Sequence, residues 1–321
     1  MDKQGFQTML EGRKVPAEKM ETALVLAERF EHFAVQQGGF CTETAWAFSK
    51  ILIAEGQNSE ENFITLARYG LFTKNNVIYI AFLEVLDGGE AQENLHKLVA
   101  QKYGETLRDS IFADIGVAPY GLPTPEKPGT MHPVIERLEN ALGSEACRAL
   151  LADSLRDLPD YTWEREIYQS CASVDEYLVR KKQKFLEQME TCQREGRLFF
   201  AQEVTDEVLK FIRNEPEMGG GVRVGGIVYE TKIPFMAKRY LAESDRGLKR
   251  YYYCHCPWAR EAVKSGEKVT PIFCNCSAGF HKKPWEGALG QKIHADVLES
   301  VLQGDDRCRF AIHLPKTVVP T

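Results

Sequence analysis

Residues 16–39 read PAEKMETALVLAERFEHFAVQQGG, and this stretch gives the N-terminal part its helical character. Pro16 suits the start of a helix, and the pair Gly38-Gly39 suits its end. The apolar residues between them recur with the i, i+3, i+4, i+7 spacing of one helix face: Met20, Ala23, Leu24, Ala27, Phe30 and Ala34. The stretch therefore predicts one amphipathic helix.

Helical patterns continue on the C-terminal side of this segment. Helices are predicted over residues 42–54, from Ser59 onward, and over 79–86 and 90–103. Ser59 is a good capping residue, and the two glutamates that follow it favour the positive end of a helix dipole. Residues 1–118 are therefore predicted to form a helical domain.

A segment rich in proline and glycine, residues 119–133, follows the predicted helical domain. It contains five prolines, which lack a backbone N–H and fit neither a helix interior nor a central strand. We expect it to be a linker to a second domain, residues 134–321. Helices are predicted in that domain over residues 132–158, which overlap the linker, and 173–195.

The composition changes after Met218, where glycine-rich turns alternate with short strand-like runs. Strands are predicted over residues 226–233, 250–256, 270–276, 292–302 and 307–314, and a helix is predicted over 278–289. Gly304-Asp305-Asp306 is a suitable hairpin turn between the last two strands. The fold class is therefore α+β, with a helical N-terminal part followed by a small mixed α/β C-terminal domain that contains an antiparallel sheet.

Composition and charge narrow the classes of function. The formal net charge of −6 gives no overall basic field for nucleic acid, and no apolar run is long enough to span a membrane. The first fifteen residues do not resemble a secretory signal, so we expect a cytoplasmic protein with reduced thiols. Nine cysteines in that compartment indicate metal or redox chemistry rather than disulfides.

The cysteines concentrate in the part of the second domain that spans about residues 219–314. Cys254-His255-Cys256 and Cys274-Asn275-Cys276 are separated by seventeen residues. If both runs are strands, residues i and i+2 share a face and four thiols converge. Four thiolates suit tetrahedral zinc, so we predict a zinc site of Cys254, Cys256, Cys274 and Cys276.

Two more residues are candidates to complete or open this site. They are Cys308, on the last predicted strand, and His281, five residues after Cys276. A closed site of four thiolates would be structural, whereas a site with a bound water would be hydrolytic, with Glu286 or Glu299 as weak candidates for its base. An iron-sulfur cluster uses the same ligands, and plain reduced thiols are the simplest alternative.

The other histidines and cysteines named here are not predicted to bind metal. His294 and His313 alternate with apolar residues on predicted strands and are expected to be simple polar residues. The cysteines that stand alone in helical segments are expected to be small buried side chains: Cys41, Cys147, Cys171 and Cys192.

The tail of the chain carries a longer signature. Residues 274–280 read CNCSAGF, residues 285–290 read WEGALG, and residues 304–312 read GDDRCRFAI. This pattern resembles the four-vinyl reductase type of small-molecule-binding domain, the L-2-amino-thiazoline-4-carboxylic acid hydrolase-like proteins, and an uncharacterised cysteine-rich bacterial family. The resemblance implies a ligand-binding α/β domain with metal-binding potential at the cysteines named above, including Cys308. Four-vinyl reductase domains often have a further cysteine where this chain has Ser300-Val301.

Three functions follow as alternatives. The first is a cytosolic metal-thiolate protein, with zinc, whose C-terminal domain binds a small molecule in a sensor or accessory role. The second is a zinc-assisted hydrolase of a small cyclic amide or thiazoline-like substrate. The sequence therefore allows both an enzyme and a binding protein. The third is an iron-sulfur or thiol redox protein. The helical N-terminal part is a candidate surface for a homodimer.

Overall fold

The computed structural model describes residues 1–153 and 155–316, and its α+β architecture confirms the predicted fold class. Ser59 caps the fourth helix as expected, because its Oγ accepts a hydrogen bond from the N–H of Asn62 at 3.2 Å. The apolar face predicted for residues 16–39 is buried. The N-terminal helices are α1 (Lys3–Gly12), α2 (Ala17–Gln36), α3 (Thr42–Ala54), α4 (Glu60–Phe72), α5 (Asn76–Leu86), α6 (Ala91–Tyr103) and α7 (Glu105–Phe112).

The predicted linker is helical in its second half, and the expectation that its prolines exclude a helix is wrong there. A 3-10 turn, η1 (Thr124–Glu126), leads into α8 (Lys127–Leu142). Pro128 lies in the first turn of α8, where the chain needs no N–H donor, so it favours the helix start. Pro133 lies inside α8 and removes one helical hydrogen bond.

A buried lysine fixes the start of α8 against the end of α5. The Nζ of Lys127 donates hydrogen bonds to the carbonyl oxygens of Glu84 at 3.0 Å, Val85 at 3.3 Å and Asp87 at 3.0 Å. These carbonyls are among the last of α5, which have no helical donor of their own. Burial lowers the pKa of Lys127 to about 8. The lysine therefore takes the place of a C-terminal cap for α5.

The middle of the chain is also helical. The helix predicted over residues 132–158 is divided at Gly143, whose φ of 78° lies in the left-handed region. Ser173 caps the long helix predicted over 173–195, since its Oγ accepts from the N–H of Glu176 at 3.1 Å. The helices of this part are α9 (Ser144–Leu151), α10 (Trp163–Gln169), α11 (Val174–Arg194) and α12 (Asp206–Asn214).

The described residues contain one antiparallel sheet with the order β1-β2-β4-β3. Its strands are β1 (Val222–Val224), β2 (Ile227–Thr231), β3 (His294–Glu299) and β4 (Arg309–His313). Three of the predicted strands are therefore present in shorter form. Between β2 and β3 lie α13 (Ala237–Ala242), α14 (Arg246–Tyr253), α15 (Arg260–Ser265), the 3-10 turn η2 (Pro271–Cys274) and α16 (Asn275–Leu289), and η3 (Val301–Gln303) precedes β4.

Two predicted strands, residues 250–256 and 270–276, are wrong. The first lies largely in α14, whose start is capped by Asp245 through a hydrogen bond of 2.8 Å from the N–H of Leu248. The tyrosines that suggested a strand have only a weak intrinsic preference, which this cap and the burial of Tyr253 override. The second predicted strand lies instead in η2, which begins at Pro271, and in the first turn of α16.

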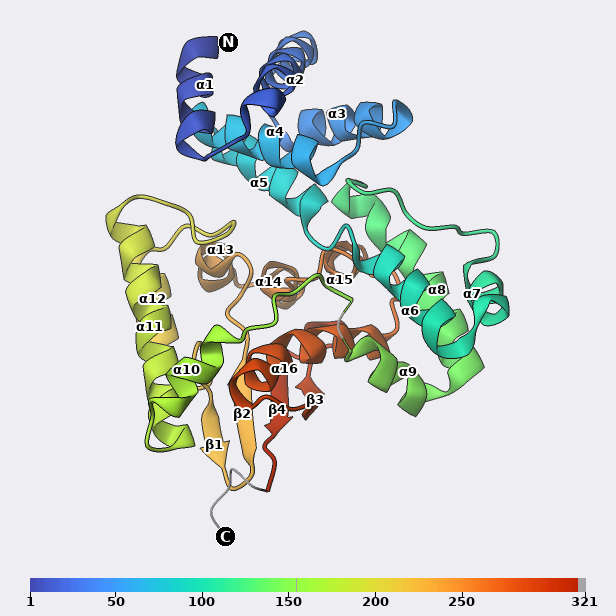
Figure 1. The fold of residues 1–321 in the computed structure, drawn as a ribbon, viewed down its shortest axis with the longest axis vertical. Coiled ribbons are helices and arrows are strands. Elements are labelled where there is room, and N and C mark those ends of the chain that lie inside the picture. The colour runs from blue at the N-terminus through green and yellow to red at the C-terminus, as the bar shows by residue number, and fades with distance from the viewer. Residues whose placement is uncertain (154, 317–321) are drawn as a thin grey trace.

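The second of the hydrophobic cores joins parts of the chain that are far apart in sequence. It combines buried residues between 91 and 155 with buried residues between 253 and 301. Trp258 Nε1 donates to the carbonyl oxygen of Gly88 at 2.8 Å, and Arg260 forms an ion pair with Glu84 at 2.9 Å. This second core therefore crosses the predicted linker. Figure 1 shows α14 and α15 between the N-terminal helices α1 to α5 and the sheet.

None of the described helices combines the length and the apolar character that crossing a membrane requires.

Candidate metal centre

Five cysteines from three separate segments gather at the second core: Cys254, Cys256, Cys276 and Cys308 lie in or against it, and Cys274 directly follows its residue Phe273. Cys254 follows the last residue of α14 and is buried, with Cys256 two residues later. Cys274 ends η2, and Cys276 lies in the first turn of α16. Cys308 precedes β4. We call these residues the five-cysteine cluster. The paired strands that were expected to bring the thiols together are absent from this region, so the convergence comes from turns and helix ends.

Burial and mutual repulsion keep these thiols protonated. Burial raises the pKa of Cys256 and of Cys274 to about 12, and raises that of Cys254 well above its ordinary value. The neighbouring thiols Cys256, Cys308 and Cys274 raise the pKa of Cys254 further. A thiolate, and not a thiol, is the metal ligand, so a bound cation is needed to hold these sulfurs ionised.

The thiols differ in which of the other thiols affect their pKa. The pKa of Cys274 is raised by burial and by both Cys308 and Cys256, so Cys254, Cys256, Cys274 and Cys308 form one connected set. Cys276 raises the pKa of Cys256, and burial raises the pKa of Cys276 itself, against the opposing effects of the Leu155 backbone and the Arg156 charge. The effects on pKa therefore link Cys308 to Cys254 and Cys274, and link Cys276 to Cys256.

The sulfurs are not packed as tightly as the ligands of one bound ion. In the described chain, no three of these cysteines have sulfurs that all lie within 4.8 Å of one another. Four thiolates on one tetrahedral zinc, with bonds of about 2.3 Å, would be roughly 3.8 Å apart. Cys274 Sγ instead lies 3.2 Å from the Oγ of Ser300, one of the two residues at which this chain departs from the four-vinyl reductase pattern.

One lysine supplies positive charge beside the five-cysteine cluster. Lys232 follows β2, and its N–H donates to the carbonyl oxygen of Cys308 at 3.1 Å. Its Nζ lies 3.1 Å from the Oγ of Ser277. Its charge lowers the pKa of four of the thiols, against the larger effect of burial: Cys256, Cys274, Cys276 and Cys308.

The two histidines near the cluster are held by other groups. His255 Nε2 lies 2.7 Å from the carbonyl oxygen of Ile233, and burial lowers the pKa of this histidine to about 3. His281, the candidate additional ligand, has its Nδ1 2.7 Å from Glu230 and stacks on the ring of Phe310 at 4.3 Å. The structure therefore places His281 in a separate charged group.

That charged group centres on Glu230, which sequence reasoning missed. Trp285 Nε1 donates to its carboxylate at 2.8 Å, and Lys181 Nζ donates at 3.1 Å. Burial alone would raise the pKa of Glu230, but Lys181, His281 and Trp285 outweigh it and lower the pKa to about 2. The only signal in the sequence was the i, i+4 spacing of His281 and Trp285, which puts both on one helix face.

Replacing Glu230 with glutamine should lower the free energy of unfolding in a pH-dependent way. The folded pKa near 2 lies below the unfolded value, so the carboxylate stabilises the fold above about pH 4.3 and this stability is lost as the pH falls toward 2. We expect a loss on the order of 3 kcal/mol at pH 7, which shrinks below about pH 4. Urea unfolding at several pH values measures it, with Glu203→Gln at an exposed ion pair as the control. A difference that does not change with pH would contradict the assignment.

The two carboxylates considered as a general base are both in ion pairs. Glu286 lies within 3.2 to 3.7 Å of the Nζ atoms of Lys282, Lys283 and Lys292. Glu299 forms a two-point pair with Arg307 at 2.8 and 2.9 Å, which lowers the pKa of Glu299. These contacts give both residues structural roles.

Two open hollows lie away from the cysteines. One, of about 740 Å³, lies beside α11 and β1 and is lined by residues that include Leu178, Val179, Lys182 and Arg223. The other, of about 420 Å³, lies beside α2 and α3. None of the described residues that line either hollow is a cysteine.

Residues 237–319 match the model of a family described as a family of unknown function, DUF6144. This segment includes all five cysteines of the cluster and the signature of the tail. The match shows that the tail is similar to an uncharacterised family and gives no link to four-vinyl reductase. No curated protein and no solved structure matches the chain.

Proposed function

We propose that this protein is a metal-thiolate protein whose C-terminal part holds a zinc ion on cysteines of the five-cysteine cluster, in a sensor or accessory role. One observation carries the proposal, namely that five cysteines from three distant segments converge: four lie in or against one hydrophobic core, and the fifth, Cys274, affects the pKa of the buried Cys254. Isolated buried cysteines act as small apolar side chains and have no reason to gather. A gathered set of sulfur donors suits a soft or borderline cation.

The chain around the cluster fits a closed centre with a negative charge. Four thiolates around Zn²⁺ carry a net charge of −2, and a buried charge needs a partner. Lys232 supplies one positive charge next to the thiols, and its Nζ is oriented by Ser277. The side chain of Ser300 contacts Cys274 and can orient that ligand. When bound, the ion would hold the three segments together and so contribute to folding.

The spacing of the sulfurs also supports an iron-sulfur cluster as a second candidate. Each thiolate of such a cluster binds a different iron or shares one with a single partner, so the ligands spread over a larger volume than around one zinc. Among the described cysteines, no three sulfurs lie close enough together to bind one ion, and this fits the wider arrangement. Zinc would require the cysteine side chains to rotate until their sulfurs are closer together.

We also propose that the protein binds a small molecule, and this part of the proposal rests on the hollow beside α11. Its volume of about 740 Å³ lies in the range of known ligand sites, and apolar Leu178 and Val179 stand beside the charged Lys182 and Arg223. A hydrolase has less support, because Glu286 and Glu299 are both in ion pairs and the hollows lie away from the cysteines.

Elemental analysis and an absorption spectrum of protein purified without oxygen test the proposal. After dialysis against a chelator, which removes weakly held ions from exposed sites, we expect close to one zinc per chain in the wild type and almost none in a Cys254→Ser/Cys274→Ser variant. Cys192→Ser is the matched control, because Cys192 is also buried but belongs to a different core. Iron with visible absorbance would support the second candidate. Wild-type protein without either metal would contradict both.

A further inference from the structure

A second group of metal-binding side chains lies on the sheet, apart from the cysteines. The antiparallel pairing of β3 with β4 puts His294 directly opposite His313. Asp296 is two residues after His294 on the same strand, so its side chain emerges on the same face. The side chains of His294 and Asp296 are both exposed, so this face meets solvent here.

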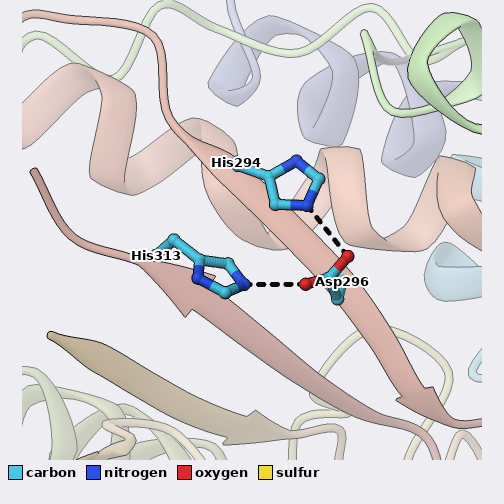
Figure 2. A group of neighbouring side chains, drawn as sticks. All are labelled: His294, Asp296 and His313. Carbon is cyan, nitrogen blue, oxygen red and sulfur yellow. Dashed lines mark hydrogen bonds and ion pairs between the residues drawn. The ribbon is translucent and has the colours of Figure 1, made fainter. Parts of the chain in front are cut away.

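The three side chains point toward one another, as Figure 2 shows. His294 Nε2 lies 2.9 Å from one carboxylate oxygen of Asp296, and His313 Nε2 lies 2.7 Å from the other. One potential ligand atom from each residue can be chosen so that all three lie within 4.8 Å of one another. In the described chain this is the one group of three or more metal-binding residues that satisfies that limit.

We propose that His294, Asp296 and His313 bind a divalent first-row transition ion, of the zinc or nickel class, through both Nε2 atoms and a carboxylate oxygen. Two imidazoles and one carboxylate favour these ions over Mg²⁺ and Ca²⁺, which prefer oxygen ligands alone. Binding needs each imidazole to carry its proton on Nδ1, so that the Nε2 lone pair faces the ion. The ion then replaces the two hydrogen bonds to Asp296.

The exposure of this site leaves room for further ligands. His294 is 70% exposed and Asp296 is 48% exposed, so solvent reaches the ion from one side. Three protein ligands with remaining positions open to water or a small anion are the pattern of metal sites that exchange ligands.

The site is independent of the five-cysteine cluster. His313 is five residues beyond Cys308, a separation of about 16 Å along an extended chain. The two groups also differ in donor chemistry, with sulfur in one and nitrogen and oxygen in the other. A cobalt ion distinguishes them, because only a thiolate ligand gives strong sulfur-to-metal charge-transfer absorption.

Titration of the full-length protein with Co²⁺, monitored by calorimetry and by absorption spectroscopy, tests the proposal. We expect one ion per chain that binds without new sulfur-to-metal charge transfer, and at least about tenfold weaker binding in His294→Ala and in Asp296→Asn. Both residues are substantially exposed, so neither change should unfold the sheet. His32→Ala, a change of another exposed histidine, is the matched control and should bind like the wild type.

Equal binding in the wild type and in both variants would overturn the assignment, as would a wild type in which every bound Co²⁺ shows thiolate absorption. Binding seen only at millimolar Co²⁺ would also overturn it, because it would mean a nonspecific surface association. None of these results depends on whether the cysteines hold a metal, since the two sites have different spectra.

Discussion

Replacing Cys308 with serine is expected to remove the metal from the five-cysteine cluster, whereas replacing Cys276 with serine should leave most of it there. The Cys308 thiol raises the pKa of both Cys254 and Cys274, whereas Cys276 raises that of Cys256 and is itself influenced by the Leu155 backbone and Arg156. Loss of one of four thiolate ligands should weaken zinc binding by well over about tenfold, more than the loss of a group that only orients a ligand.

The comparison of the two variants separates the set of ligands expected from the sequence from the set favoured by the structure. Metal content after dialysis against a chelator measures both, with Cys192→Ser as the control for a buried cysteine elsewhere. Retention of metal in Cys308→Ser together with its loss in Cys276→Ser would restore the two Cys-x-Cys pairs as the ligand set. Equal loss would assign all five thiols to the centre.

Replacing Arg260 with leucine is expected to lower the free energy of unfolding by about 3–5 kcal/mol. The Arg260 side chain is 2% exposed, pairs with Glu84 at 2.9 Å, and lies over the ring of Phe235 at 4.6 Å. Its removal leaves Glu84 buried without its partner, in a place where burial already raises the pKa of that carboxyl. Most of the loss comes from this stranded charge and not from the missing bond.

Urea unfolding followed by circular dichroism measures this effect. The double variant Glu84→Gln/Arg260→Leu should recover a substantial part of the loss, because it no longer contains a buried unpaired carboxylate. Arg246→Leu removes an exposed ion pair with Asp306 and should leave the stability close to that of the wild type. An equal loss in the single and double variants would show that packing, and not charge, accounts for the effect.

The helices that could be predicted are those whose periodicity and caps agree. The helix over 42–54 and the caps Ser59 and Ser173 are determined by neighbours in sequence, and each is present in the structure. Residues 250–253 could not be assigned in this way, because tyrosines suit both helix and strand and the decision depends on the cap at Asp245 and the burial of Tyr253.

The candidate sites also divide into features that the local sequence determines and features that the tertiary fold determines. A concentration of cysteines is visible in composition alone, so the segments of the five-cysteine cluster could be named from the sequence. Which thiols are neighbours depends on how α14, η2 and β4 pack, and that arrangement has no local signature. The contact between Glu230 and His281 joins residues 51 positions apart, and the pair of His294 with His313 needs the register of β3 on β4.

The second core has a consequence for how this fold can be divided. The segment that matches the family model begins at residue 237, but Trp258 and Arg260 within it depend on Gly88 and Glu84 in the N-terminal half. Lys127 joins the same stretch through the carbonyls at the end of α5. A gene fusion or truncation that keeps only the matched segment would remove these contacts. The smallest part of this protein that keeps them therefore extends upstream at least to α5.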